Sequence, residues 1–263
     1  MSLKGSKTPI IFVLTIDTEE EWDWSGPFPQ KVAKVNNIDK LPAFNSICEK
    51  LGIRPTYFVD YAVSNSKNAV EKMQTFTSKG NCEIGAHLHP WCNPPYFGEV
   101  GEAESHVINL PVEQDPLKQG KQQTIYELPV TVGFNRTNFE LANSVHVAFA
   151  KPPLSWTRFN GLAWHSNLLR KIYLCPELSA PEDMLTLCEK VIDKGYPVLH
   201  MYMHSSSLLD NQVGLLDSEQ NPFDFISDAV TKVVTQLKSK YDIEFCTISE
   251  AADKLQTMDK PAA

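Results

Sequence analysis

The sequence lacks long hydrophobic runs and an excess of basic residues, and each absence excludes a class of protein. The apolar run at residues 10–16 is too short to span a bilayer and has no cleavage-type ending, so we expect neither a membrane span nor a signal peptide. Residues 1–8 are mostly polar and are predicted to be flexible. The net charge of −8 over 263 residues disfavours nucleic acid and anionic lipid as partners, because phosphate groups repel an acidic chain.

The sequence also lacks any Cys-x-x-Cys pair. The spacing of its six cysteines matches neither a zinc ribbon nor a small disulfide scaffold, so we expect buried free thiols that act as small apolar side chains. Free thiols are typical of a reducing compartment, and the sequence therefore predicts a cytoplasmic protein. The six residues are Cys48, Cys82, Cys92, Cys175, Cys188 and Cys246.

No internal repeat, low-complexity stretch or Gly/Ser linker divides the chain, and we expect one domain over residues 1–263. Short apolar segments alternate with longer amphipathic segments, which is typical of βα units around a mainly parallel sheet. A stretch at residues 92–123, rich in Pro, Gly, Glu and Gln, is predicted to be a long irregular loop. Strands are predicted at residues 10–16, 55–60, 82–89, 124–134, 172–175, 197–203 and 243–248, and helices at 39–51, 68–79, 136–150, 180–194, 223–241 and from 249 onward.

Three of the predicted strands end in residues that can bind a metal ion or transfer protons. The first ends at Asp17 and Glu19, the third at His87 and His89, and a later one at His204. Because the carboxyl ends of parallel strands lie on one rim, these side chains can converge. Residues i and i+2 of an extended strand point to the same face, so both imidazoles of the third strand can face one ion. Two histidines and a carboxylate, with positions left open for water, indicate a hydrolytic metal site.

Each of these features also has a purely structural interpretation. A histidine pair can bond nearby backbone, and an isolated histidine such as His204 is more often structural. The acidic residues between positions 19 and 23 could form a solvated loop, although the interspersed Trp22 and Trp24 count against it, since indoles prefer partial burial. The coincidence of three such strand ends favours a functional site.

Six segments in a defined order carry a family resemblance. They are residues 10–17 (IIFVLTID), 54–59 (RPTYFV), 82–87 (CEIGAH), 127–131 (ELPVT), 175–177 (CPE) and 203–208 (MHSSSL). Together they resemble the polysaccharide deacetylase family over most of the chain, with the weakest agreement in the middle. The resemblance implies a distorted (β/α)7-type barrel, incomplete here because the middle is short. It also implies a metal-dependent hydrolase that removes acetyl groups from N-acetylated sugars or glycans.

The resemblance also implies roles for individual residues. Asp17 stands at the position of the family's catalytic base, and His87 at that of its first metal-binding histidine. His204 matches the late histidine that acts as general acid.

The chain departs from the family pattern at two ligand positions. The usual Asp-Asp pair is Asp17 and Thr18 here, and Trp91 stands where the second metal-binding histidine is expected. Glu19 and His89 are therefore predicted to substitute as metal ligands. The expected cofactor is a divalent metal ion, with zinc or a similar first-row ion in this role.

The family's arginine-containing motif is not found between the histidines and Glu127, so Arg158 is predicted to supply a substrate-binding guanidinium. Trp22 and Trp91 are predicted to contact a carbohydrate substrate, but aromatic residues near the rim could equally pack the long loop onto the core. Two alternatives stay open, because fold does not determine substrate. The chain could be a metal amidohydrolase acting on a small non-sugar amide, or a catalytically inactive carbohydrate-binding relative.

Overall fold

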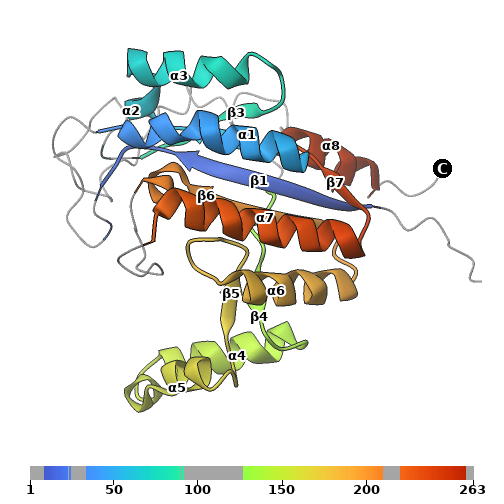
Figure 1. The fold of residues 1–263 in the computed structure, drawn as a ribbon. Coiled ribbons are helices and arrows are strands. Elements are labelled where there is room, and N and C mark those ends of the chain that lie inside the picture. Colours follow the sequence, from blue (N-terminus) through green and yellow to red (C-terminus); the bar gives the residue numbers. More distant parts are fainter. Residues whose placement is uncertain are drawn as a thin grey trace, which may run out of the picture.

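The computed structural model describes residues 9–22, 24, 34–89, 91, 127–209 and 220–258. The expectations for residues 1–8 and 92–123 lie outside these ranges. The described elements confirm the predicted α/β class (Figure 1). In chain order they are β1 (Ile10–Thr18), η1 (Asn36–Lys40), α1 (Leu41–Leu51), β2 (Thr56–Val59), α2 (Tyr61–Ser64), α3 (Lys67–Thr77), β3 (Glu83–Ala86), β4 (Val132–Phe134), α4 (Phe139–Ala150), η2 (Leu154–Thr157), α5 (Phe159–His165), β5 (Lys171–Tyr173), α6 (Pro181–Asp193), β6 (Val198–His204), η3 (Ser205–Leu208), α7 (Pro222–Lys240), β7 (Ile243–Phe245) and α8 (Ile248–Met258).

A parallel sheet forms the centre of the molecule. Its strand order is β3-β2-β1-β6, and β7 pairs with β1 as well. One edge of β1 pairs with β6, which places Asp17 opposite His204. The other edge is shared, because β7 pairs with the start of β1 and β2 with its end. The described strands run in an open series from β3 to β6, so closure into a (β/α)7-type barrel is not confirmed.

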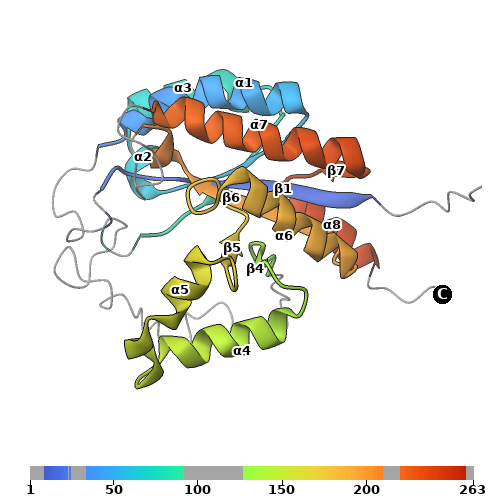
Figure 2. The same ribbon diagram turned by 60° about the horizontal axis from the view of Figure 1, so that its bottom comes forward.

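Strand β1 is buried on both faces, which explains its unbroken apolar sequence. Phe12, Leu14 and Ile16 point into the large core, to which α1, α3, α6 and α7 contribute. Ile11 and Val13 point into a smaller core on the opposite face, which is covered by α8. Figure 2 shows the two layers, with α1, α3 and α7 on one side of the sheet and α8 on the other. This packing holds β1 rigidly, so that its carboxyl end can position side chains accurately.

A separate lobe, here called the α4–α5 lobe (residues 132–173), projects beyond α6, away from the parallel sheet (Figures 1 and 2). Its two short strands, β4 and β5, are antiparallel. The lobe joins the sheet through backbone bonds on either side of these strands: the Thr131 N–H donates to the His200 carbonyl (3.0 Å), and the Tyr202 N–H to the Leu174 carbonyl (3.2 Å). Its buried core is small and consists of Phe134, Ala142, Ala163 and Leu169.

Helix ends follow the sequence signals more closely than strand ends do. Gly52 and Gly195 follow α1 and α6 with φ of 83° and 82°, a left-handed conformation that glycine adopts without a steric penalty. The predicted strands at residues 82–89, 124–134 and 243–248 shorten to β3, β4 and β7, so that His87 and His89 lie just beyond β3. Residues 124–126 are not described. Helix α5 was not predicted, because Gly161 interrupts its helical pattern.

The cysteines agree with the sequence-based expectation. The five described cysteines are free thiols, four of them buried, whereas Cys92 lies outside the described residues. In the part of the chain that the structure describes, no helix is both long enough and apolar enough to cross a membrane.

Candidate metal centre and acid–base residues

The predicted chemical residues meet where β1, β3 and β6 end. Because these strands are parallel, their carboxyl ends share one rim of the sheet. The residues there surround an open cavity of about 400 Å³. Its lining consists of Asp17, Glu19, Trp22, Trp24, His87, His89 and His204.

Three donor atoms at this rim form a compact triangle. Glu19 Oε2 lies 3.2 Å from His87 Nε2 and 3.1 Å from His89 Nε2, and the two Nε2 atoms are 3.0 Å apart. Ligands placed at ~2.0–2.1 Å around a tetrahedral zinc ion are about 3.3 Å from one another. The triangle therefore has both the donor types and the size that such an ion requires, and this cluster could hold a metal ion.

The backbone of Glu19 is held in place by hydrogen bonds to side chains from η3 and η1. Its backbone N–H donates to Ser205 Oγ (3.2 Å), and its carbonyl accepts from the Asn37 side-chain amide (2.9 Å). Burial alone would raise the pKa of the Glu19 carboxyl, but hydrogen bonds with His87 and His89 outweigh burial and lower that pKa. Glu19 is therefore an anion at neutral pH, as a metal ligand must be.

His89 is oriented by a buried carboxylate behind it. Its Nδ1 lies 3.0 Å from both oxygens of Glu20, and Trp91 Nε1 donates to Glu20 Oε1 at 2.7 Å. The Trp91 ring also stacks on the His89 imidazole, with centroids 4.4 Å apart. Metal-binding histidines commonly donate their second N–H to a carboxylate, which fixes the tautomer. Glu20 therefore directs the lone pair of His89 Nε2 toward Glu19 and His87.

Glu20 shares its buried environment with Asp60, at the end of β2. Asp60 accepts the backbone N–H of Glu20 (3.3 Å) and that of Val63, where it caps α2 (2.8 Å). Burial and the Glu20 carboxylate raise the pKa of Asp60 well above its usual range. Burial also acts to raise the pKa of Glu20, but hydrogen bonds from His89 and Asp60 outweigh it and lower that pKa. The two pKa values thus move apart, which favours the negative charge on Glu20 and the proton on Asp60. Glu20, Asp60 and His89 also lie close enough to share an ion, but their polar atoms are engaged in this network.

Asp17 and His204, the predicted acid–base pair, lie on the neighbouring strands β1 and β6. His204 Nε2 is 3.7 Å from Asp17 Oδ2, and His204 Nδ1 is 2.9 Å from Glu177 Oε2. Burial alone would lower the pKa of His204. The hydrogen bond to Glu177 and the negative charges of Glu177, Glu19 and Asp17 together outweigh burial and raise that pKa. Burial also raises the pKa of Asp17, against the opposing effect of His204. His204 thus retains a proton more readily than a free imidazole does.

The structure brings most of the sequence-predicted residues together but separates two of them from the cavity. Trp22 and Trp24 line it, and the edge of Trp24 contacts the His204 ring (centroids 4.4 Å apart). Trp91 is buried against His89 and is not among the described lining residues, so its geometry matches the packing alternative. Arg158 lies between η2 and α5 on the α4–α5 lobe and does not line the cavity.

Sequence reasoning assigned no role to Glu20, Asp60 or Glu177. A signal existed for Asp60, because it is the last residue of the strand predicted at residues 55–60, on the same rim. For Glu177 the signal was its place two residues after Cys175, at the end of another predicted strand. Glu20 had no such signal, because it stands in an acidic run in which only the tertiary structure distinguishes one carboxylate from the next.

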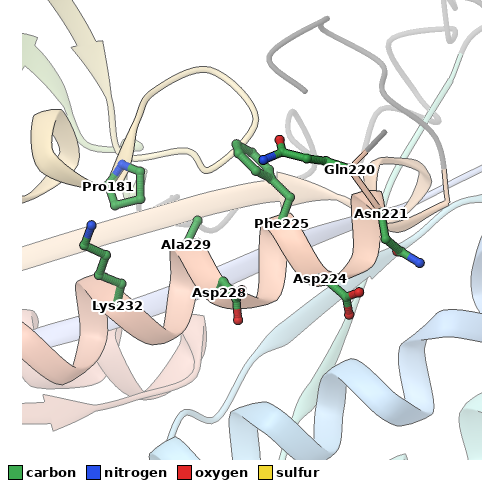
Figure 3. A pocket seen from close by; sticks show the side chains of 8 residues that line it. All are labelled: Pro181, Gln220, Asn221, Asp224, Phe225, Asp228, Ala229 and Lys232. Atoms are coloured by element: carbon green, nitrogen blue, oxygen red, sulfur yellow. The ribbon is translucent and has the colours of Figure 1, made fainter. Parts of the chain in front are cut away.

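A second cavity of about 340 Å³ lies beside the first turns of α7 (Figure 3). Its acidic residues, Asp224 and Asp228, are one helical turn apart, and Lys232 forms an ion pair with Glu182. The described residues that line it include no histidine or cysteine, so the candidate centre remains at the strand ends. They are Pro181, Gln220, Asn221, Asp224, Phe225, Asp228, Ala229 and Lys232.

Comparisons with protein-family models, curated proteins and solved structures found no match to this chain. A functional assignment therefore depends on the geometry of the strand-end residues.

Proposed function

We propose that this chain is a metal-dependent hydrolase that removes acetyl groups from N-acetylated sugars or glycans, on an incomplete barrel of the polysaccharide deacetylase type. One observation carries the proposal: a buried carboxylate and two imidazoles converge within 3.0–3.2 Å, beside a second carboxylate and a third histidine. A ligand triangle next to an acid–base pair is the arrangement that hydrolysis of an amide by activated water requires.

The ligand set favours zinc or a similar first-row ion, because imidazole nitrogen and carboxylate oxygen suit such ions. When held by Glu19, His87 and His89, the ion would activate a water molecule and polarise the amide carbonyl. The carboxylate of Glu20 supports this role, since it orients His89 from behind.

The proton transfers belong to Asp17 and His204. Asp17 takes the proton of the attacking water, and its raised pKa suits a general base better than an ordinary carboxylate would. His204 gives a proton to the amide nitrogen, so that the C–N bond breaks with a neutral amine leaving. Glu177 accepts the Nδ1–H of His204 and stabilises the protonated ring, so that the Nε2–H can be given to the amide nitrogen. The 3.7 Å between Asp17 and His204 allows both to act on one tetrahedral carbon.

A sugar substrate is supported by the aromatic side of the cavity. The rings of Trp22 and Trp24 line it beside the acid–base pair, and indole faces are suited to stack on sugar rings. The cavity is open, so an acetylated residue within a longer glycan has room to enter. Arg158 has no part in this proposal, because it lies outside the cavity.

The experiment combines metal analysis with acetate release from a panel of N-acetylated glycans. We expect the purified protein to contain about one equivalent of a divalent metal and His87→Ala to lose both the metal and the activity, since a missing ligand leaves the triangle open. His165→Ala is the matched control, because His165 is exposed at the end of α5 and should leave both unchanged. Full metal content in His87→Ala would contradict the ligand assignment. If the protein binds metal but is active only on small non-sugar amides, the substrate is such an amide and not a sugar. A metal-free protein would indicate a catalytically inactive relative.

A further inference from the structure

The tip of the α4–α5 lobe exposes large apolar side chains to solvent. Trp156 is 81% exposed, Leu162 67% and Leu154 41%. They lie within nine residues of one another, in η2 and the first turn of α5. Large apolar residues this exposed, and this close together in the chain, favour an interaction surface. Four more exposed apolar residues lie on the same lobe: Leu141, Val147, Trp164 and Leu168.

The same lobe is basic although the chain is acidic. Residues 132–173 contain five basic residues and one acidic residue, in a chain whose net charge is −8. Arg170 forms an ion pair with Asp183 (3.1 Å). Lys151 and Arg158 are exposed and stand before and after Trp156 in the sequence. Charges further away than about 8 Å are largely screened at physiological ionic strength. A surface that touches the tip therefore meets its local positive charge rather than the average charge of the chain.

We propose that this tip docks on an anionic lipid surface, with Trp156, Leu154 and Leu162 at headgroup level and Lys151 and Arg158 on the lipid phosphates. Tryptophan is favoured at membrane interfaces because its ring is apolar and its N–H is polar. Basic residues beside it add electrostatic attraction to anionic headgroups. A symmetric second copy fits less well, because a two-fold contact would set the basic tip against itself. Such docking places the protein on the membrane surface and requires no membrane span.

The test uses the whole protein and lipid vesicles. We expect sedimentation with vesicles of phosphatidylcholine mixed with phosphatidylglycerol, weakened by added salt, and little sedimentation with phosphatidylcholine alone. Trp156→Ala should reduce the partition coefficient about ten-fold through lost apolar burial. Lys151→Glu combined with Arg158→Glu should reduce it at least about 25-fold, since each basic residue at the surface contributes roughly a factor of five. Brominated lipid should quench part of the tryptophan fluorescence, and Trp156→Phe should remove that part.

Two controls change similar residues elsewhere on the molecule. Lys67→Glu with Lys79→Glu reverses two charges on the α3 side, and Tyr196→Ala removes an exposed aromatic ring after α6. Both should bind vesicles like the unmodified protein, and thermal unfolding should show every variant folded. The proposal would be overturned if the control variants lose as much vesicle binding as the tip variants do. It would also be overturned if the unmodified protein does not bind anionic vesicles. If the tip variants instead change the molecular mass in solution while no vesicle binding occurs, the tip belongs to a contact between copies of this chain and the lipid proposal is wrong.

Discussion

His89 connects the candidate metal centre to the buried carboxylate of Glu20, with one ring nitrogen facing each. We expect Glu20→Gln to weaken zinc affinity by about 10- to 100-fold, because a neutral amide no longer stabilises the N–H tautomer that leaves Nε2 free. Trp91→Phe should have a smaller effect, since it removes the donor to Glu20 but keeps a ring stacked on His89.

Competition with a chelating dye measures the affinity, and the absorption spectrum of the cobalt-loaded protein reports the ligand geometry. Glu71→Gln is the matched control, because Glu71 is exposed on α3 and forms an ion pair with Lys67. The positioning role of Glu20 is contradicted if Glu20→Gln binds zinc as tightly as the control and gives the same cobalt spectrum.

In the proposed mechanism Glu177 stabilises the protonated form of His204, so its removal should change the pH dependence of the proposed activity. The hydrogen bond to Glu177 raises the pKa of His204, and a general acid acts only while protonated. Activity should therefore fall as pH rises through the pKa of His204. In Glu177→Gln that pKa drops, and the high-pH limb of kcat/KM should move to lower pH. An NMR titration of the His204 ring should shift in the same direction. Glu182→Gln changes an exposed residue of α6 and should alter neither the high-pH limb of kcat/KM nor the pKa of His204. If the high-pH limb of Glu177→Gln stays where it is in the unmodified protein, Glu177 has no part in the mechanism.

At the scale of elements, the strand–helix alternation was predictable because burial patterns are local. The strand at residues 10–16 and the helix at 223–241 correspond closely to β1 and α7. The convergence of His87 and His89 on Glu19 was also predictable, because the carboxyl ends of β1 and β3 share one rim. Strand periodicity was not the cause, since β3 ends at Ala86 and both histidines lie just beyond it. The network behind His89 was not, because Glu20, Asp60 and Trp91 are brought together only by tertiary folding. The place of Arg158 was missed for the same reason: no local pattern separates the α4–α5 lobe from the rim.

Gly133 in β4 allows the α4–α5 lobe to approach α6 closely. A Cβ built at this position would lie 2.6 Å from Leu187 Cδ1 in α6 and 3.1 Å from Phe139 Cζ in α4. Because Leu187 is fully buried and cannot easily move, we expect Gly133→Ala to lower the free energy of unfolding by about 1–3 kcal/mol. Gly161→Ala in α5 meets nothing within 4 Å and should raise it by roughly 0.5–1 kcal/mol. Urea unfolding compares the two, and equal stability of both variants would show that the lobe does not need this close approach.

At the scale of the whole molecule, the candidate centre connects strands that do not pair with each other. Glu19 follows β1 and the two histidines follow β3, while β2 lies between them in the sheet. An ion bound here would therefore link the centre of the sheet to its edge strand. Unfolding would have to break that link, because the unfolded chain does not hold the three ligands together.

This link makes metal content a determinant of overall stability. With free zinc at 100 times its dissociation constant, binding to the folded state adds about 2.7 kcal/mol. A chain of this size should then gain roughly 5–10 °C in Tm, since each kcal/mol shifts Tm by about 2–4 °C. Thermal scans with zinc and with a chelator measure the difference. His87→Ala should melt at one temperature under both conditions, because its ligand triangle is broken, whereas His165→Ala should respond like the unmodified chain. A zinc-dependent shift of equal size in His87→Ala would mean that the ion binds elsewhere and does not join β1 to β3.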